Sequence, residues 1–236
     1  MENTLKCLRT SPQSINSIKV WKVIRDYAKV ATNLASRSLP HFPAMKDFDI
    51  RQIILLNLGR RYKNDPNTMI IEELGLCQGE ARIDIAVVNG SIHGYEIKGD
   101  QDTLKRLAGQ VAIYSRVLDF VTLVVSSQHL DEGLKIIPEW WGIAGVEKNK
   151  RKIILREIRP HEKNPEPDPE AIVQLIWRNE ALGILSKRGL DSGYVSKTKW
   201  ALWERIMEEL SLNELREEVR NTLKLRGNWR SVQPLK

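Results

Sequence analysis

Three charged residues lie inside two apolar segments, where charge is costly to bury without partners. Asp84 lies in the segment ARIDIAVV, and Glu96 and Lys98 lie in the segment IHGYEIK. Strand side chains alternate between faces, so Glu96 and Lys98 point the same way, and a hairpin would bring Asp84 to their shared face. Two carboxylates that approach each other repel unless a cation intervenes. The spacing D-x11-E-x-K therefore predicts that Asp84 and Glu96 hold magnesium or manganese.

Such a site has the parts needed to hydrolyse a phosphodiester bond. A metal held by Asp84 and Glu96 would activate a water molecule, and Lys98 would stabilise the developing charge. Gln110 would position the water or the nucleic acid, and Tyr114 shares its helix face four residues later and could stack on the nucleic acid. The residues also allow a structural Glu–Lys or Asp–Lys pair at a strand end, with Tyr114 in an ordinary helix-to-sheet contact.

The elements that must position these residues follow in a regular order. Asp49 could cap a helix that runs to about Tyr62. Asn89-Gly90 indicates a two-residue hairpin, and the apolar run 120–126 indicates a buried central strand. The predicted elements are a helix over 49–62, strands over 68–76, 81–88 and 92–98, a helix over 103–118, and strands over 120–126, 142–147 and 152–158.

The order helix, three strands, helix, strand predicts a mixed α/β core, that is, an α+β fold with a mixed sheet. We divide the chain into a basic N-terminal helical arm (1–43), the core (44–160), a proline-rich linker (161–170) and a C-terminal helical region (171–236). The arm includes a predicted helix over 14–36, and the C-terminal region includes predicted helices over 171–185, 197–210 and 212–225. The arm carries seven basic and two acidic residues.

Composition narrows the class of protein. The 236 residues carry a net charge of +7 and a pI near 9.4, which favours a polyanionic partner such as nucleic acid. With no apolar run of about 18 residues, no secretory signal and only two cysteines, we predict a cytoplasmic protein without membrane spans or disulfides. Lys224, Arg226 and Arg230 form a basic cluster that could hold a phosphate backbone, although a frayed basic C-terminus would look the same.

These motifs resemble the PD-(D/E)xK nuclease superfamily, whose members have a restriction-endonuclease-like fold. Asp84, Glu96 and Lys98 match its metal-binding and catalytic positions, and the run from Gln110 to Tyr114 resembles the Q-x3-Y motif of one of its branches. The segment 72–110 and the run PEWWGI at 138–143 look more closely like the uncharacterised bacterial family called sce7726, over about residues 47–229. The resemblance implies a metal-dependent DNA endonuclease, a phosphodiesterase that uses Mg²⁺ or Mn²⁺ and could act as a homodimer.

One departure from that pattern keeps other functions open. The superfamily usually supplies an acidic residue from the helix before the first strand, and the run from Ile50 to Tyr62 contains no Glu or Asp. Glu72 and Glu73 point to opposite faces of their strand, and the resemblance favours Glu73 as the third metal ligand. The alternative is a catalytically inactive nucleic-acid-binding or partner-binding module that keeps the nuclease-like fold.

Overall fold

The computed structural model describes residues 46–149 and 152–226, which belong to one compact unit. The predicted N-terminal helix over 14–36 and Arg230 lie outside these residues. The described chain has a mixed α+β fold built on one six-stranded sheet and seven α-helices. The predicted order of helix, three strands, helix and strand is confirmed, as is the mixed sheet.

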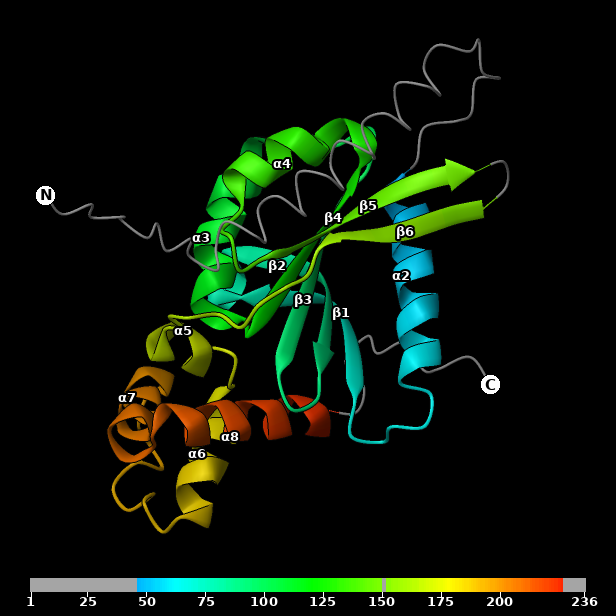
Figure 1. Cartoon of the computed structure of the whole chain (residues 1–236). Coiled ribbons are helices and arrows are strands. Elements are labelled where there is room, and N and C mark those ends of the chain that lie inside the picture. Colours follow the sequence, from blue (N-terminus) through cyan, green and yellow to red (C-terminus); the bar gives the residue numbers. More distant parts are fainter. Residues whose placement is uncertain (1–45, 150–151, 227–236) are drawn as a thin grey trace, which may run out of the picture. The chain divides into compact units, whose positions relative to one another are not determined.

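The strands lie in the sheet in their order along the chain (Figure 1). Hairpin neighbours are antiparallel, whereas β3, β4 and β5 are mutually parallel because helices connect them. The bounds are β1 Met69–Leu76, β2 Ala81–Val88, β3 Ile92–Lys98, β4 Phe120–Ser126, β5 Gly142–Asn149 and β6 Lys152–Arg159.

Helices cover both faces of the sheet (Figure 1). Helix α2 packs Ile50, Ile54 and Leu58 against apolar side chains of β2, β3, β4 and β5, and so forms the core on one face. On the opposite face, α4 places Gly133 against Leu123 of β4, and α3 lies beside it. The bounds are α2 Asp47–Arg61, α3 Leu107–Val117 and α4 Leu130–Ile136, with 3-10 turns at Cys77–Gly79, Leu104–Arg106 and Ser127–His129.

Gly94 allows the end of α3 to approach β3 closely. A Cβ atom at Gly94 would lie 2.6 Å from a methyl carbon of Leu118 and 3.0 Å from Ile83. Real Cβ atoms essentially never come so near to another heavy atom. The absence of a side chain at this position therefore helps to set how far α3, which carries Gln110 and Tyr114, sits above the sheet.

The C-terminal helices pack together beside the β2–β3 hairpin (Figure 1). Helix α8 buries Leu215, Val219 and Leu223 along one stripe, and Ser211 caps its first turn. The helices are α5 Pro169–Val173, α6 Arg178–Lys187, α7 Lys199–Glu209 and α8 Leu212–Leu225.

Several predicted boundaries differ from the structure. The pair Val88–Ile92 closes the hairpin, so its loop has three residues, Asn89 to Ser91, instead of two. The helix predicted over 171–185 is two helices, because Trp177 is extended and the Glu180 carboxylate accepts a hydrogen bond from its amide at 2.7 Å. Helix α4, which we did not predict, has only seven residues and is too short for a clear helical period.

The proline-rich segment predicted as a linker is fastened to the core. The Asn164 amide donates hydrogen bonds to the carbonyl oxygens of Ser115 and Leu118, at 2.7 and 2.8 Å. The Asp168 carboxylate accepts a hydrogen bond from the amide of Glu170 in the first turn of α5, and it forms an ion pair with Arg116 at 2.8 Å. These contacts join the segment to the end of α3.

Candidate functional site

Asp84 lies where β2 and β3 separate. The ladder between these strands ends at the pair Ile85–Tyr95. Beyond it, the Asp84 Oδ2 atom accepts a hydrogen bond from the amide of Ile97 at 2.7 Å. The carboxylate therefore lies between the strands, and not above the face that carries Glu96 as we predicted from alternation.

Arg51 of α2 approaches Asp84 from the other side. Its Nη2 atom lies 2.7 Å from Asp84 Oδ1, and its Nη1 atom donates to the Asp84 carbonyl oxygen at 3.0 Å. The same guanidinium group pairs with Glu73 at 2.7 Å and with Asp47 at 3.2 Å. One cation, whose side chain is 12% exposed, thus joins three carboxylates from α2, β1 and β2.

Glu73 joins this group through a local distortion of β1. Its φ angle of 57° is in the left-handed region, which costs a non-glycine residue about 1–3 kcal/mol. The ladder between β1 and β2 skips the position where Glu73 would face Asp84. Glu73 also pairs with Arg82 at 2.6 Å, so two ion pairs accompany the strained backbone.

Glu96 and Lys98 form a buried ion pair on the α3 side of the sheet. Their side chains are 2% and 7% exposed, and Lys98 Nζ contacts Glu96 Oε1. Gln110 Nε2 donates to the same oxygen at 2.7 Å, and the Tyr114 hydroxyl lies 2.8 Å from Oε2. A buried carboxylate needs such partners, and both oxygens of Glu96 have them.

Tyr114 is part of the core. Its side chain is fully buried, and its hydroxyl also lies 2.7 Å from the carbonyl oxygen of Arg82. A hydroxyl has one proton, so it can donate to Arg82 or to Glu96 at any moment but not to both. Burial, followed by the charge of Glu96, raises the pKa of Tyr114. The prediction that Tyr114 stacks on nucleic acid is wrong, because no ring face is accessible.

The Asp84 carboxyl titrates near neutral pH. Burial, followed by the nearby charge of Glu96, raises its pKa to about 7. The hydrogen bond from Ile97 and the charge of Arg51 oppose this shift without cancelling it. Asp84 and Glu96 therefore interact electrostatically, as the sequence predicted.

The oxygen atoms that a divalent cation would need already have partners within the protein. Each oxygen of Asp84 and Glu96 has a protein donor or cation within hydrogen-bond distance. Within 46–149 and 152–226, no group of three or more His, Cys, Asp or Glu residues is arranged to hold a metal. Helix α2 presents a cation, Arg51, to Asp84, and its Asp47 is paired with that same cation. The arrangement does not fit magnesium or manganese, and the expectation of either metal stays a prediction.

Arg226, one residue of the predicted C-terminal phosphate cluster, has its partners within the protein. Arg226 pairs with Glu180 at 2.6 Å, donates to the Leu175 carbonyl oxygen at 2.6 Å, and lies over the Trp177 ring. With its side chain 7% exposed, Arg226 cannot reach a phosphate backbone, so that assignment is wrong. Lys224 is half-buried near the end of α8, where its role stays a prediction.

Arg51 is the member of the cluster that sequence reasoning missed. The available signal was its position four residues after Asp47, a spacing at which opposite charges meet on a helix. The predicted helix start at Asp49 is two residues late, because α2 begins at Asp47 and includes that pair.

The sequence matches the model of one protein family. The family model described as bacteriophage P4 protein cII matches residues 45–233. The chain is also similar to the protein named Protein cII of Enterobacteria phage P4, with 27% identity over 157 residues. This match covers 66% of the chain and 59% of that relative, so the chain spans less than two thirds of the relative's length. No solved structure matches the chain.

These matches correct the family and function predicted from the sequence. The resemblance to sce7726 and to the PD-(D/E)xK superfamily is wrong, and so is the predicted function of a metal-dependent DNA endonuclease, with the classes nuclease and hydrolase. The physical reason is that D-x11-E-x-K is also the pattern of a self-neutralised polar cluster. Catalysis of any kind, the homodimer and the cytoplasmic location stay predictions. No helix in the described part of the chain could cross a membrane.

Proposed function

Because the chain belongs to the family of bacteriophage P4 protein cII, we propose that it is a regulatory protein that binds DNA and uses the Asp84–Glu96 cluster to hold its fold together. Arg51 and Lys98 support the second part of this proposal. They neutralise the two carboxylates within the chain and join α2, β1, β2 and β3. A buried ion pair that is fully hydrogen-bonded can fix the geometry of neighbouring elements.

The observation that carries DNA binding is where the positive charge lies. Residues 46–149 and 152–226 contain 26 basic and 28 acidic residues, so they are slightly acidic. Residues 1–45, 150–151 and 227–236 contain 11 basic and 2 acidic residues, which is the whole surplus. Segments rich in basic residues, next to a sequence whose charges nearly balance, are typical of proteins that contact phosphate backbones.

DNA binding is tested with the full chain and labelled duplex DNA at several salt concentrations. We expect affinity to fall steeply with salt, because each phosphate contact releases counterions. A variant that loses four N-terminal cations should lower the slope of log K against log salt by up to about 3.6. The substitutions to glutamine are at Lys19, Lys22, Arg25 and Lys29.

A matched control removes the same net charge from exposed positions of the body. Its four substitutions to glutamine are at Arg60, Lys105, Lys187 and Lys197. We expect this control to change the slope by less than half as much. Equal slopes for the two variants would show that only net charge matters, and absence of binding to any DNA at about 50 mM salt would refute the proposal.

A further inference from the structure

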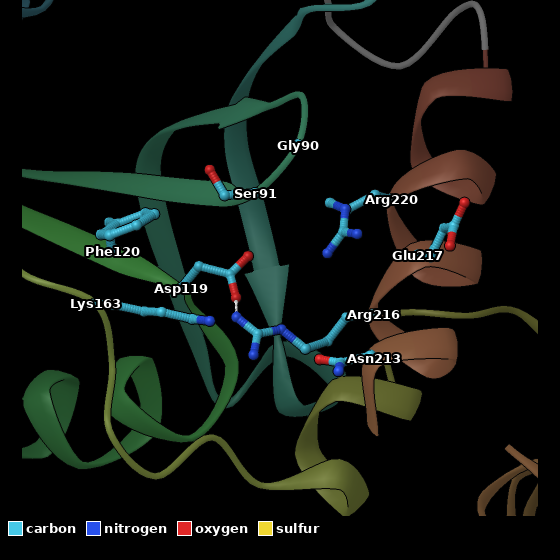
Figure 2. A pocket seen from close by; sticks show the side chains of 9 residues that line it. All are labelled: Gly90, Ser91, Asp119, Phe120, Lys163, Asn213, Arg216, Glu217 and Arg220. Carbon is cyan, nitrogen blue, oxygen red and sulfur yellow. Dashed lines mark ion pairs between the residues drawn. The ribbon is translucent and has the colours of Figure 1, made fainter. Parts of the chain in front are cut away.

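A pocket of about 390 Å³ lies between the β2–β3 hairpin and α8 (Figure 2). Its walls come from four parts of the chain that are far apart in sequence, one of which is the start of β4 with Asp119. The hairpin loop contributes Ser91, the segment after β6 contributes Lys163, and α8 contributes Arg216 and Arg220. The volume is in the range of pockets that bind small molecules.

Arg216 is fixed in one wall of the pocket by Asp119. The two side chains form an ion pair in which Arg216 is 11% exposed and Asp119 is 5% exposed. The second oxygen of Asp119 accepts a hydrogen bond from the amide of Ile92 at 2.7 Å. The position of the Arg216 guanidinium group is therefore set by a buried, hydrogen-bonded carboxylate directly before β4, beside the first residue of β3.

Arg220 lies one helical turn after Arg216 and points into the same pocket (Figure 2). Among the residues that the structure describes, no carboxylate forms an ion pair with Arg220. Glu217 also lines the pocket, but its carboxylate points away from the other labelled side chains (Figure 2). Burial lowers the pKa of Arg216, and so does the positive charge of Arg220.

The cations Lys163, Arg216 and Arg220 thus line one pocket. The carboxylate of Asp119 is paired with one of them, Arg216. Lys163 extends from the opposite wall toward Arg216 (Figure 2) and makes no ion pair with a described residue. Asp119 neutralises one of these charges, so Arg220 and Lys163 remain available to a ligand. A tetrahedral dianion would relieve the repulsion between the arginines and would accept the paired N–H groups of a guanidinium.

We propose that the pocket formed by Lys163, Arg216 and Arg220 binds a phosphate group. The group belongs either to a free phosphate or nucleotide, or to a nucleic-acid backbone that passes the β2–β3 hairpin. The proposal of a phosphate site depends only on the geometry of the pocket. The assignment of the phosphate to a nucleic-acid backbone also rests on the proposed function. Arg220 supplies the main contact, Lys163 the opposite charge, and Asp119 holds Arg216 in place.

The first arm of the test is calorimetric titration of the full chain with inorganic phosphate at constant ionic strength, with chloride as the competing ion. We expect saturable binding that Arg220→Gln weakens at least about tenfold, the loss typical of a charge-assisted hydrogen bond. Arg60→Gln is the matched control, because Arg60 is an exposed arginine of α2 outside the pocket, and should bind as the wild type does.

Two further variants keep the result decisive if Arg220→Gln does not fold. Lys163→Gln removes the exposed charge of the opposite wall and should also weaken phosphate binding. Arg220→Lys keeps the charge but loses the planar pair of donors, so its affinity should lie between those of the wild type and Arg220→Gln. Wild-type protein that does not bind phosphate above the chloride background would overturn the proposal, as would unchanged affinity in these pocket variants.

The second arm identifies the source of the phosphate group. If the backbone of DNA is the source, Arg220→Gln should reduce the salt slope of DNA binding by about one, and Arg60→Gln should leave it unchanged. An unchanged slope together with weakened phosphate binding assigns the pocket to a free phosphate or nucleotide. Phosphate binding without any DNA binding would refute the proposed function and leave the pocket assigned.

Discussion

At the scale of single residues, Arg51 decides what the carboxylates can do. Its guanidinium group reaches Asp47, Glu73 and Asp84, and so occupies the position between the acids where a divalent ion would have to lie. A fixed organic cation cannot exchange ligands or activate water as a metal does. The same acidic residues that suggested catalysis from the sequence are therefore better explained as the anionic half of an internal salt-bridge network.

Replacing Arg51 by alanine should destabilise the fold strongly. The substitution leaves Asp84 buried without its cation, and breaking a buried pair in this way typically costs about 3–5 kcal/mol. Urea unfolding of the two variants Arg51→Ala and Arg60→Ala measures the effect. Arg60 is exposed on the same helix, so its variant should stay within about 0.5 kcal/mol of the wild type. Equal unfolding free energies for both variants would contradict a central role for Arg51.

The raised pKa of Asp84, about 7, predicts a pH dependence of stability. An unfolded aspartate has a pKa of about 3.9, so the folded state holds the proton more tightly. The stabilisation that the folded state gains from holding the Asp84 proton is fully present below about pH 4, and it is lost as the pH rises through about 7.

Asp84→Asn should remove this pH dependence of stability, because asparagine does not titrate. In urea unfolding at a series of pH values, the difference in unfolding free energy between wild type and Asp84→Asn should change by up to about 1.4 kcal/mol per pH unit between about pH 4 and 7. Asp131→Asn, at an exposed position of α4, is the control and should run parallel to the wild type. If the difference in unfolding free energy between wild type and Asp84→Asn does not change with pH, the pKa of Asp84 is the same in the folded and unfolded states.

At the scale of elements, alternation and turn residues were sufficient to predict the bounds of β2, β3 and β4. They could not predict that β1 is distorted at Glu73 or that β2 and β3 separate at Asp84, because both features depend on side-chain partners from other elements. The predicted site residues fall into two groups: Glu73 and Asp84 pair with Arg51, whereas Glu96 contacts Lys98, Gln110 and Tyr114. The first group could not be predicted, because Arg51 comes from a helix and lies 33 residues before Asp84 in the sequence.

Asn164 provides a test of how the proline-rich segment is attached. Its amide caps two carbonyl groups at the end of α3, and Asn164→Ala would leave them without these donors. We expect a loss of about 1–3 kcal/mol in the free energy of unfolding, measured with urea. Asn179→Ala, at an exposed site of α6, should change it by less than about 0.5 kcal/mol. A loss of the same small size in both variants would show that the segment is not held by Asn164.

At the scale of the whole molecule, the surplus of positive charge and the polar cluster belong to different parts of the chain. The described body is slightly acidic, and the surplus lies in the segments outside it. Net charge therefore says little about the environment of Asp84 or Glu96. Net charge bears instead on the proposed contact with a polyanion, which we assign to the basic segments and to the pocket beside α8.

Magnesium and manganese should be unnecessary for both stability and DNA binding. The carboxylates already have protein partners, so about 5–10 mM Mn²⁺ should not raise the melting temperature above that in EDTA. This concentration is about 100 times the dissociation constant of a typical weak site, so a bound ion would raise the melting temperature measurably. DNA affinity should be equal in Mg²⁺ and EDTA at matched ionic strength. A rise of several degrees in the wild type that is lost in Asp84→Asn would instead establish the metal site predicted from the sequence.

Asp119 has a consequence for how the molecule unfolds. Its backbone amide bonds the Ile92 carbonyl oxygen, its carbonyl oxygen accepts the Asn164 amide, and its carboxylate holds Arg216 of α8. The sheet, the proline-rich segment and the last helix thus share one buried residue. The C-terminal helices cannot detach without leaving the Asp119 carboxylate, directly before β4, without its cation. The body should therefore melt in a single cooperative transition, and cleavage after β6 should not release an independently stable sheet.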